Sequence, residues 1–273
     1  MPNYRLDLEY EGTRYRGWQE QQNARSVAGE IRRAIVEAGG DVVELGGAGR
    51  TDAGVHALHQ VAHLRLRAQV DPGRFRLAVN DALPHDVHLL AMARAPERFH
   101  ARHDAVLRSY VYQISRRRTA LAKRSVWWIK RAIDPARIGS AAACLPGMHD
   151  FAPFCERPQD QGSTRVLVDR AETAEEGSLV LVRLAASHFL WKMVRRLVGT
   201  LVRVGAGEMT VAEFEGIVRG TARGAATAAW TAPPSGLFLE RVLYAGDPPL
   251  PKLEAIVRVA DEERHRWPAS PAI

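Results

Sequence analysis

One short run of residues has the composition of a catalytic loop, Gly49-Arg50-Thr51-Asp52-Ala53-Gly54. It places a single carboxylate between small residues, with a guanidinium two positions before it. Glycine has no Cβ and adopts positive φ without strain, so such a loop can turn sharply and let a large planar ligand approach. A buried Asp52 needs a cation or a hydrogen-bond donor nearby, and we expect an arginine to hold it ionised. An ionised carboxylate placed in this way can act as a nucleophile.

The same region is compatible with other interpretations. Taken alone, the run also fits a tight turn closed by an Asx hydrogen bond. His59 and His63 have the spacing of a zinc-protease helix, but Gln60 replaces the general-base glutamate and the segment alternates like a strand. The glycines at 46–49 are not followed by the Gly-Lys-Ser/Thr of a phosphate-binding loop, and Asp52 lacks the second aspartate motif of an aspartic protease. We therefore predict no metal site here.

Seven further segments flank the Asp52 loop in a fixed order. They are Tyr10–Gln19, Asn80–Val87, Phe99–Arg102, Arg108–Tyr112, His149–Phe154, Ser187–Gly199 and Pro234–Leu239. Together with the run from Gly49 to Gln60, they resemble the motifs of the tRNA pseudouridine synthase A family. The resemblance extends from residue 4 to about residue 245, and Glu11 stands where that family usually has Asp.

The resemblance implies a reaction and a set of site residues. Asp52 would be the nucleophile that lets uracil leave the ribose, rotate and rejoin through carbon 5, giving pseudouridine with no cofactor. Three routes stay open, in which the carboxylate attacks the sugar C1′, attacks the base C6, or assists glycal formation. Tyr110 matches the tyrosine that stacks on the target base, and Arg195 matches the arginine that pairs with the aspartate. Arg50 matches the residue that displaces the base from its stack, and Leu237 is expected to pack against the flipped base.

Two other basic residues in the matching segments, Arg14 and Lys192, are expected to contact the RNA. The sequence departs from the family pattern at Trp191-Lys192, where many members carry histidine, and at Arg165-Val166, where an Arg-Thr pair is usual. These departures bear on RNA contacts and on how Arg195 is supported. They do not change the residues assigned to the reaction.

The composition favours a nucleic-acid partner. Lys plus Arg number 38 against 31 Asp plus Glu, which gives a formal net charge of +7, and the sequence pI is about 9.8. An excess of arginine is typical of chains that bind polyanions. Several basic clusters have aromatic residues beside them, an arrangement that suits structured RNA. The resemblance names tRNA as that partner.

The sequence also limits the compartment. No stretch approaches the roughly 20 apolar residues of a membrane span, and Met1–Asp7 contains no apolar signal core. Cys144 and Cys155 are too few for a disulfide framework or a metal finger. We expect a cytoplasmic protein that binds neither a membrane nor a small-molecule cofactor.

Apolar periodicity predicts strands and helices in a repeated order. Strands are expected at 4–10, 41–45, 60–67, 86–94, 107–115, 164–173, 178–186 and 236–244. Helices are expected from Ser26 to Gly39, near 71–82, from Asp134-Pro135 to Gly147, at 189–204, and from a capping box at Thr210. The residues from Trp267 onward are expected to form a loose tail.

This order predicts an α+β fold of two pseudo-duplicated halves. By its resemblance to the family, the chain should join them through one extended antiparallel sheet, with helices packed on one side and the active-site cleft between the halves. We place the boundary near residue 105. Residues 1–105 would carry Asp52, and residues 106–273 would carry Tyr110 and Arg195.

The resulting hypothesis is a tRNA-uridine isomerase that modifies position 38, 39 and/or 40 of the anticodon stem-loop. A tRNA is longer than one chain of this size, so a homodimer is expected, with one subunit holding the tRNA body. One alternative is a non-catalytic RNA-binding or chaperone module. A carboxylate facing phosphate-rich RNA argues against it, because its charge repels the ligand. Another alternative is the same chemistry on a different RNA.

Overall fold

The alternating strand at the start of the chain organises the first half of the sheet. In the computed structural model, which describes residues 1–222 and 226–260, β1 (Asn3–Tyr10) buries every second side chain. It pairs antiparallel with β3 (His56–Leu66) and with β4 (Val87–Ala95), and β2 (Val42–Gly47) pairs with β3. Two helices, α1 (Val27–Glu37) and α2 (Pro72–Ala82), pack against β2 and β4.

The helix starts predicted from capping residues are confirmed. The Ser26 hydroxyl accepts the backbone N–H of Gly29 at 3.2 Å, and Thr210 forms a reciprocal capping box with Glu213. In both cases the side chain satisfies a backbone N–H that has no partner within the helix. The local sequence therefore determines where these helices begin.

The second half repeats the pattern of strands backed by helices. Its strands are β5 (Ala105–Ser115), β6 (Trp127–Trp128), β7 (Gly147–Asp150), β8 (Arg165–Glu176), β9 (Leu179–Ala186) and β10 (Leu237–Tyr244). Its helices are α3 (Pro135–Ala142), α4 (Met193–Gly205) and α5 (Val211–Val218). Short 3-10 turns lie at Gly12–Arg14 (η1), Ala152–Phe154 (η2), Pro158–Asp160 (η3), Thr227–Trp230 (η4) and Pro234–Gly236 (η5).

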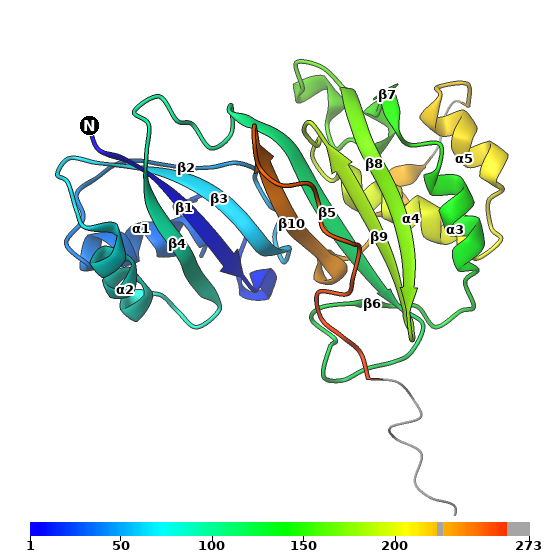
Figure 1. Cartoon of the computed structure of the whole chain (residues 1–273). Helices are drawn as coiled ribbons and strands as arrows, with labels where there is room; N and C mark the ends of the chain where they lie inside the picture. The colour runs from blue at the N-terminus through cyan, green and yellow to red at the C-terminus, as the bar shows by residue number, and fades with distance from the viewer. Residues whose placement is uncertain (223–225, 261–273) are drawn as a thin grey trace, which may run out of the picture.

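The last strand joins the two halves. The sheet runs in the order β4-β1-β3-β10-β5-β9-β8-β7, so β10 lies between a strand of each half (Figure 1). It pairs parallel with β3 at Phe238 and Leu239 and antiparallel with β5 along its length. The predicted α+β fold with an extended, mostly antiparallel sheet is confirmed. The boundary at residue 105 stays a prediction.

The two faces of the sheet are covered differently. Along β5, Tyr110 and Tyr112 join the main core beneath the helices, whereas Val111 joins a second cluster on the opposite face. That second cluster contains Leu181 of β9 and Leu253, which lies on the segment that crosses in front of the sheet in Figure 1. Every residue of β9 is buried, because helices cover one face and this segment covers the other.

Some predicted element ends were wrong. The helix expected from Phe189 begins at Met193, because Lys192 before it adopts a left-handed conformation, with φ of 59°. The helix expected to close at Gly147 ends at Ala142, and Gly147 instead opens β7. The tail predicted from Trp267 lies outside the described residues. Among the helices that the structure describes, none has the length and apolarity needed to cross a bilayer.

Candidate active site

The loop that carries Asp52 is held by hydrogen bonds from β1 and the turn after it. The carbonyl of Thr51 accepts the N–H of Trp18 at 3.1 Å, and the N–H of Gly54 donates to the carbonyl of Tyr15 at 3.2 Å. The hydroxyls of Tyr10 and Thr51 are 2.8 Å apart. With backbone and side chain both anchored, the loop presents Asp52 in a defined place.

A glycine makes this close approach possible. Gly17 has φ of +96°, and a Cβ built on it would lie 2.5 Å from the carbonyl oxygen of Thr51. Only glycine combines this backbone conformation with room for the loop. Gly17 and Trp18 therefore pack directly against Thr51, the residue before Asp52.

Arg195, in the first turn of α4, lies beside Asp52. Its Nη1 atom is 3.4 Å from Oδ2 of Asp52, and its Nε atom donates to the carbonyl of Ala232 at 2.7 Å. The expected arginine is therefore present, from the other half of the sequence. Both side chains are partly buried, with exposed fractions of 23% for Asp52 and 14% for Arg195.

Burial raises the pKa of the Asp52 carboxyl above its ordinary value, and it outweighs the opposing effect of Arg195. Lys192 and the neighbouring Trp191 side chain also oppose the rise in this pKa, by smaller amounts. A carboxylate with a raised pKa is more basic than an exposed aspartate and hence a stronger nucleophile once ionised.

Tyr110 projects from β5 into the same cleft. It is 8% exposed, and its ring meets the edge of Phe189 at a centroid distance of 5.1 Å and an interplanar angle of 87°. Burial raises the pKa of the Tyr110 hydroxyl, and the nearby Tyr10 and Asp52 add to the rise. The phenol therefore stays protonated at neutral pH, as a flat ring that can also donate a proton.

These residues line one cleft of about 690 Å³ between the two halves. Asp52, Tyr110 and Arg195 all face it, together with Leu237 at the start of β10. Arg50 lies exposed at its edge.

The other two predicted RNA-binding residues take different positions. Lys192 lines the cleft and forms an ion pair of 3.2 Å with Glu156. Arg14 is exposed in η1 and lies outside the cleft. The structure thus brings Lys192 to Asp52 and leaves Arg14 apart from it.

Sequence reasoning did not assign a role to Arg108, which joins the two halves. Its buried guanidinium donates to the carbonyls of Ala48 at 3.1 Å and Ser187 at 2.8 Å, and to those of Ala105 and Arg102. Ala48 precedes the Asp52 loop and Ser187 precedes the turn into α4. The signal available in the sequence was that Arg108 opens the segment Arg108–Tyr112.

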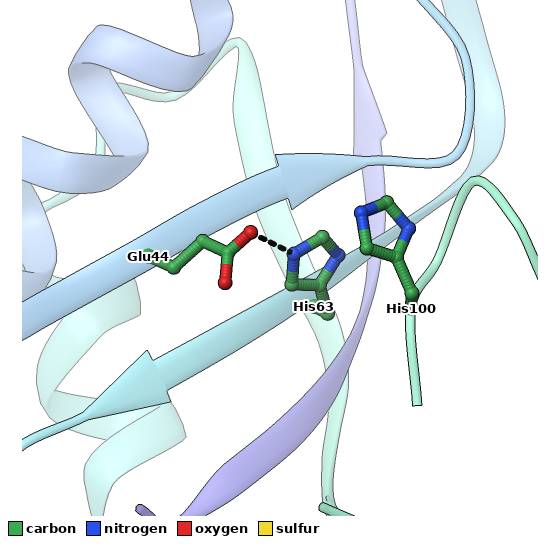
Figure 2. A group of neighbouring side chains, drawn as sticks. All are labelled: Glu44, His63 and His100. Carbon is green, nitrogen blue, oxygen red and sulfur yellow. Dashed lines mark ion pairs between the residues drawn. The ribbon is translucent and has the colours of Figure 1, made fainter. Parts of the chain in front are cut away.

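A group of possible metal ligands, Glu44, His63 and His100, lies at the wall of the cleft, with ligand atoms within 4.8 Å of one another (Figure 2). The hydrogen bonds of the rings argue against a metal. Nδ1 of His63 accepts the N–H of Ala101, and Nδ1 of His100 accepts the N–H groups of Arg102 and His103.

Each neutral ring must then carry its proton on Nε2, the nitrogen that a metal would need. Nε2 of His63 lies 3.2 Å from a Glu44 oxygen, the contact that Figure 2 draws as a dashed line. The two atoms are at ion-pair distance, but this Nε2 makes no hydrogen bond within the described residues. Because both Nδ1 atoms accept backbone N–H groups, and neither ring donates from Nδ1 to an acceptor as a metal-ligating histidine usually does, this donor set does not fit a metal centre.

Comparison with known proteins agrees with this arrangement. The profile of a family described as tRNA pseudouridine synthase matches residues 8–104 and 141–245. The tRNA pseudouridine synthase A of Afipia carboxidovorans is 41% identical over 247 residues, which cover 89% of this chain and 100% of that protein. Those of Mesorhizobium japonicum and Sinorhizobium fredii are 41% and 38% identical over 249 residues each, with the same coverage.

The mixed α+β sheet, the cleft and the matching profile define a pseudouridine synthase, a class of isomerase. Because the profile spans most of the chain and these relatives are similar over their whole length, the chain belongs to the tRNA pseudouridine synthase family. The family predicted from the motifs is thereby confirmed.

Proposed function

We propose that this chain converts uridine to pseudouridine in the anticodon stem-loop of tRNA, at position 38, 39 and/or 40, with Asp52 as nucleophile. One observation carries the proposal. The Asp52–Arg195 pair and the ring of Tyr110 face the same cleft, although they come from three distant parts of the sequence. The relatives' names supply the substrate class, tRNA.

The geometry supports a division of roles among the residues of the cleft. A uridine must leave its stack to reach Asp52, and the exposed Arg50 can occupy the position that the base vacates. Tyr110 offers a flat face to the flipped base, with Leu237 beside it. The guanidinium of Arg195 keeps the carboxylate in place while it attacks the sugar C1′ or the base C6, or assists glycal formation.

The reaction needs nothing beyond the chain and its RNA. Breaking the N-glycosidic bond, rotating the base and forming the bond to carbon 5 conserve every atom, so no co-substrate enters the balance. We propose that the protein works as a cytoplasmic homodimer, in which the second subunit holds the tRNA body that one chain is too small to span.

Pseudouridine mapping on unmodified tRNA transcripts tests the proposal. The wild type should form pseudouridine only at positions 38–40 of the anticodon stem-loop, with no metal or nucleotide added, and Asp52→Ala should form none while binding tRNA. Asp169→Ala is the matched control for removal of an aspartate side chain, because Asp169 is exposed on β8 and lies outside the cleft, and we expect it to retain the chemistry. Tight binding without isomerisation by the wild type would favour the RNA-binding module, and pseudouridine elsewhere would favour another RNA target.

A further inference from the structure

Trp191 is an exposed aromatic residue at the rim of the cleft. The preceding Leu190 is buried, whereas Trp191 is 42% exposed and lines the cleft. Its carbonyl accepts the N–H of Glu156 at 2.9 Å. The backbone is therefore tied to the neighbouring segment, and the indole stands in a defined place at the entrance to the site.

The surroundings of the indole suit an anionic, planar ligand. The guanidinium of Arg157 and the ammonium of Lys192 each lie 5.5 Å from the ring centroid. Cations at this distance attract the ring face and help to hold its orientation. The guanidinium of Arg157 also adds positive charge at this rim, whereas the ammonium of Lys192 is paired with Glu156.

Two aromatic rings thus face the cleft at different depths. Tyr110 is 8% exposed and can be reached only by a base that has left its stack, whereas Trp191 is open to solvent. The Trp191 side chain is also close enough to Asp52 to oppose the rise in the pKa of that carboxyl. A strand that delivers a uridine to Asp52 can therefore contact the indole on its way in.

We propose that Trp191 is a substrate-binding residue on which a nucleobase adjacent to the target uridine stacks. The inference rests on the proposed function for the identity of the RNA. Any base can use an indole face, because stacking requires a π surface and no particular hydrogen-bond pattern. Trp191 would hold the strand in register while the next base enters the cleft.

Trp128 provides a matched control. It is 39% exposed and has the guanidinium of Arg118 at 5.5 Å from its ring centroid, so its exposure and cation contact resemble those of Trp191. It does not line the cleft. A general effect of removing an exposed indole would appear equally in both variants.

The test measures binding of a labelled anticodon stem-loop RNA by fluorescence anisotropy. We expect Trp191→Ala to raise the Kd about 5- to 150-fold, the range for loss of one stacked base. Trp191→Phe should retain most of the affinity, and Trp128→Ala should match the wild type. The single-turnover rate at saturating RNA should change much less than the Kd, because the indole acts in binding.

Stem-loops with a single abasic nucleotide then identify the partner base. At one position beside the target uridine, the wild type should lose affinity on removal of the base, and Trp191→Ala should lose little more. Equal losses in the two proteins at every position, or the same Kd for Trp191→Ala and Trp128→Ala, would overturn the proposal. A wild type that binds the stem-loop but forms no pseudouridine would reject the proposed function, while the abasic comparison would still decide the role of Trp191.

Discussion

Arg195 donates to the carbonyl of Ala232 at 2.7 Å and lies 3.4 Å from the carboxylate of Asp52. The N–H of Ala232 in turn donates to the carbonyl of Arg195 at 3.0 Å. The shorter contacts are therefore those to the backbone, and the one made by Nε orients the guanidinium independently of the ion pair. Asp52 enters a positive site that the surrounding fold has already arranged, which is the condition for electrostatic preorganisation.

Replacing Arg195 by Gln should shift the acid limb of the pH–rate profile to higher pH. Arg195 lowers the pKa of Asp52, so its loss lets burial raise that pKa further and leaves less carboxylate at a given pH. Single-turnover rates should fall at least about tenfold at neutral pH and less in alkaline solution. Arg195→Lys, which keeps the charge, should show a smaller shift. An unchanged profile in Arg195→Gln would disprove the coupling.

Asp52→Asn should abolish the reaction and stabilise the fold at neutral pH. The folded-state pKa of Asp52 lies above its unfolded value, so folding disfavours the ionised form, and stability falls as pH rises through this interval. Removing the charge should raise Tm by about 1–3 °C at pH 7. The gain should vanish in acid, where the wild-type carboxyl is protonated in both states. Calorimetry at two pH values measures it, and a lower Tm at pH 7 would contradict the account.

Gly17→Ala should impair both folding and catalysis. The added Cβ would lie 2.5 Å from the Thr51 carbonyl and force the Asp52 loop to move. We expect a loss of at least about 2 kcal/mol and a fall in kcat of about 10- to 100-fold. Gly39→Ala is the control, since Gly39 has φ of +87° with no atom within 4 Å of the new Cβ. It should lose about 1 kcal/mol and keep the wild-type kcat. Equal kcat values in the two variants would show that the loop tolerates the shift.

Glu240→Ala should destabilise the protein without touching the cleft. The carboxylate of Glu240 accepts two hydrogen bonds from Arg183, which is 1% exposed, and a third from the Ser109 hydroxyl. Removal would leave a buried guanidinium with Glu172 as its remaining acidic partner, at a cost of about 3–5 kcal/mol. Glu172→Ala should cost about 1 kcal/mol or less, because that carboxylate is 40% exposed. Urea unfolding separates the two, and similar midpoints would refute the assignment.

The features predicted best from the sequence were those with a local cause. Ser26 and Thr210 each cap a helix through a hydrogen bond to a residue three positions later. The alternation of apolar and polar residues at 4–10 predicts the half-buried strand that the structure shows. The start of α4 was wrong because the left-handed backbone at Lys192 leaves no trace in the apolar spacing of 189–204. The contacts that determine it, such as the bond between Glu156 and Trp191, join segments far apart.

The site could be anticipated only in part for the same reason. Asp52, Tyr110 and Arg195 were identified through motifs, and their meeting in one cleft depends on long-range pairing that periodicity does not encode. Arg108 and the neighbours of His63 were missed. Arg108 donates to the carbonyl of Ala48, and His63 accepts the N–H of Ala101. These partners are far away in the sequence, so only the tertiary structure shows which groups meet.

The position of β10 has a consequence for how the protein is made. Asp52 lies just before β3, and Tyr110 lies on β5. Both strands leave the ribosome long before Leu237–Tyr244 is translated. Until then the position between β3 and β5 is empty, and the two halves have no strand that pairs with both of them. A chain that stops before Leu237 therefore lacks the one strand that pairs with both β3 and β5, and we expect such a product to be inactive. We therefore expect activity only from chains whose synthesis has continued through β10.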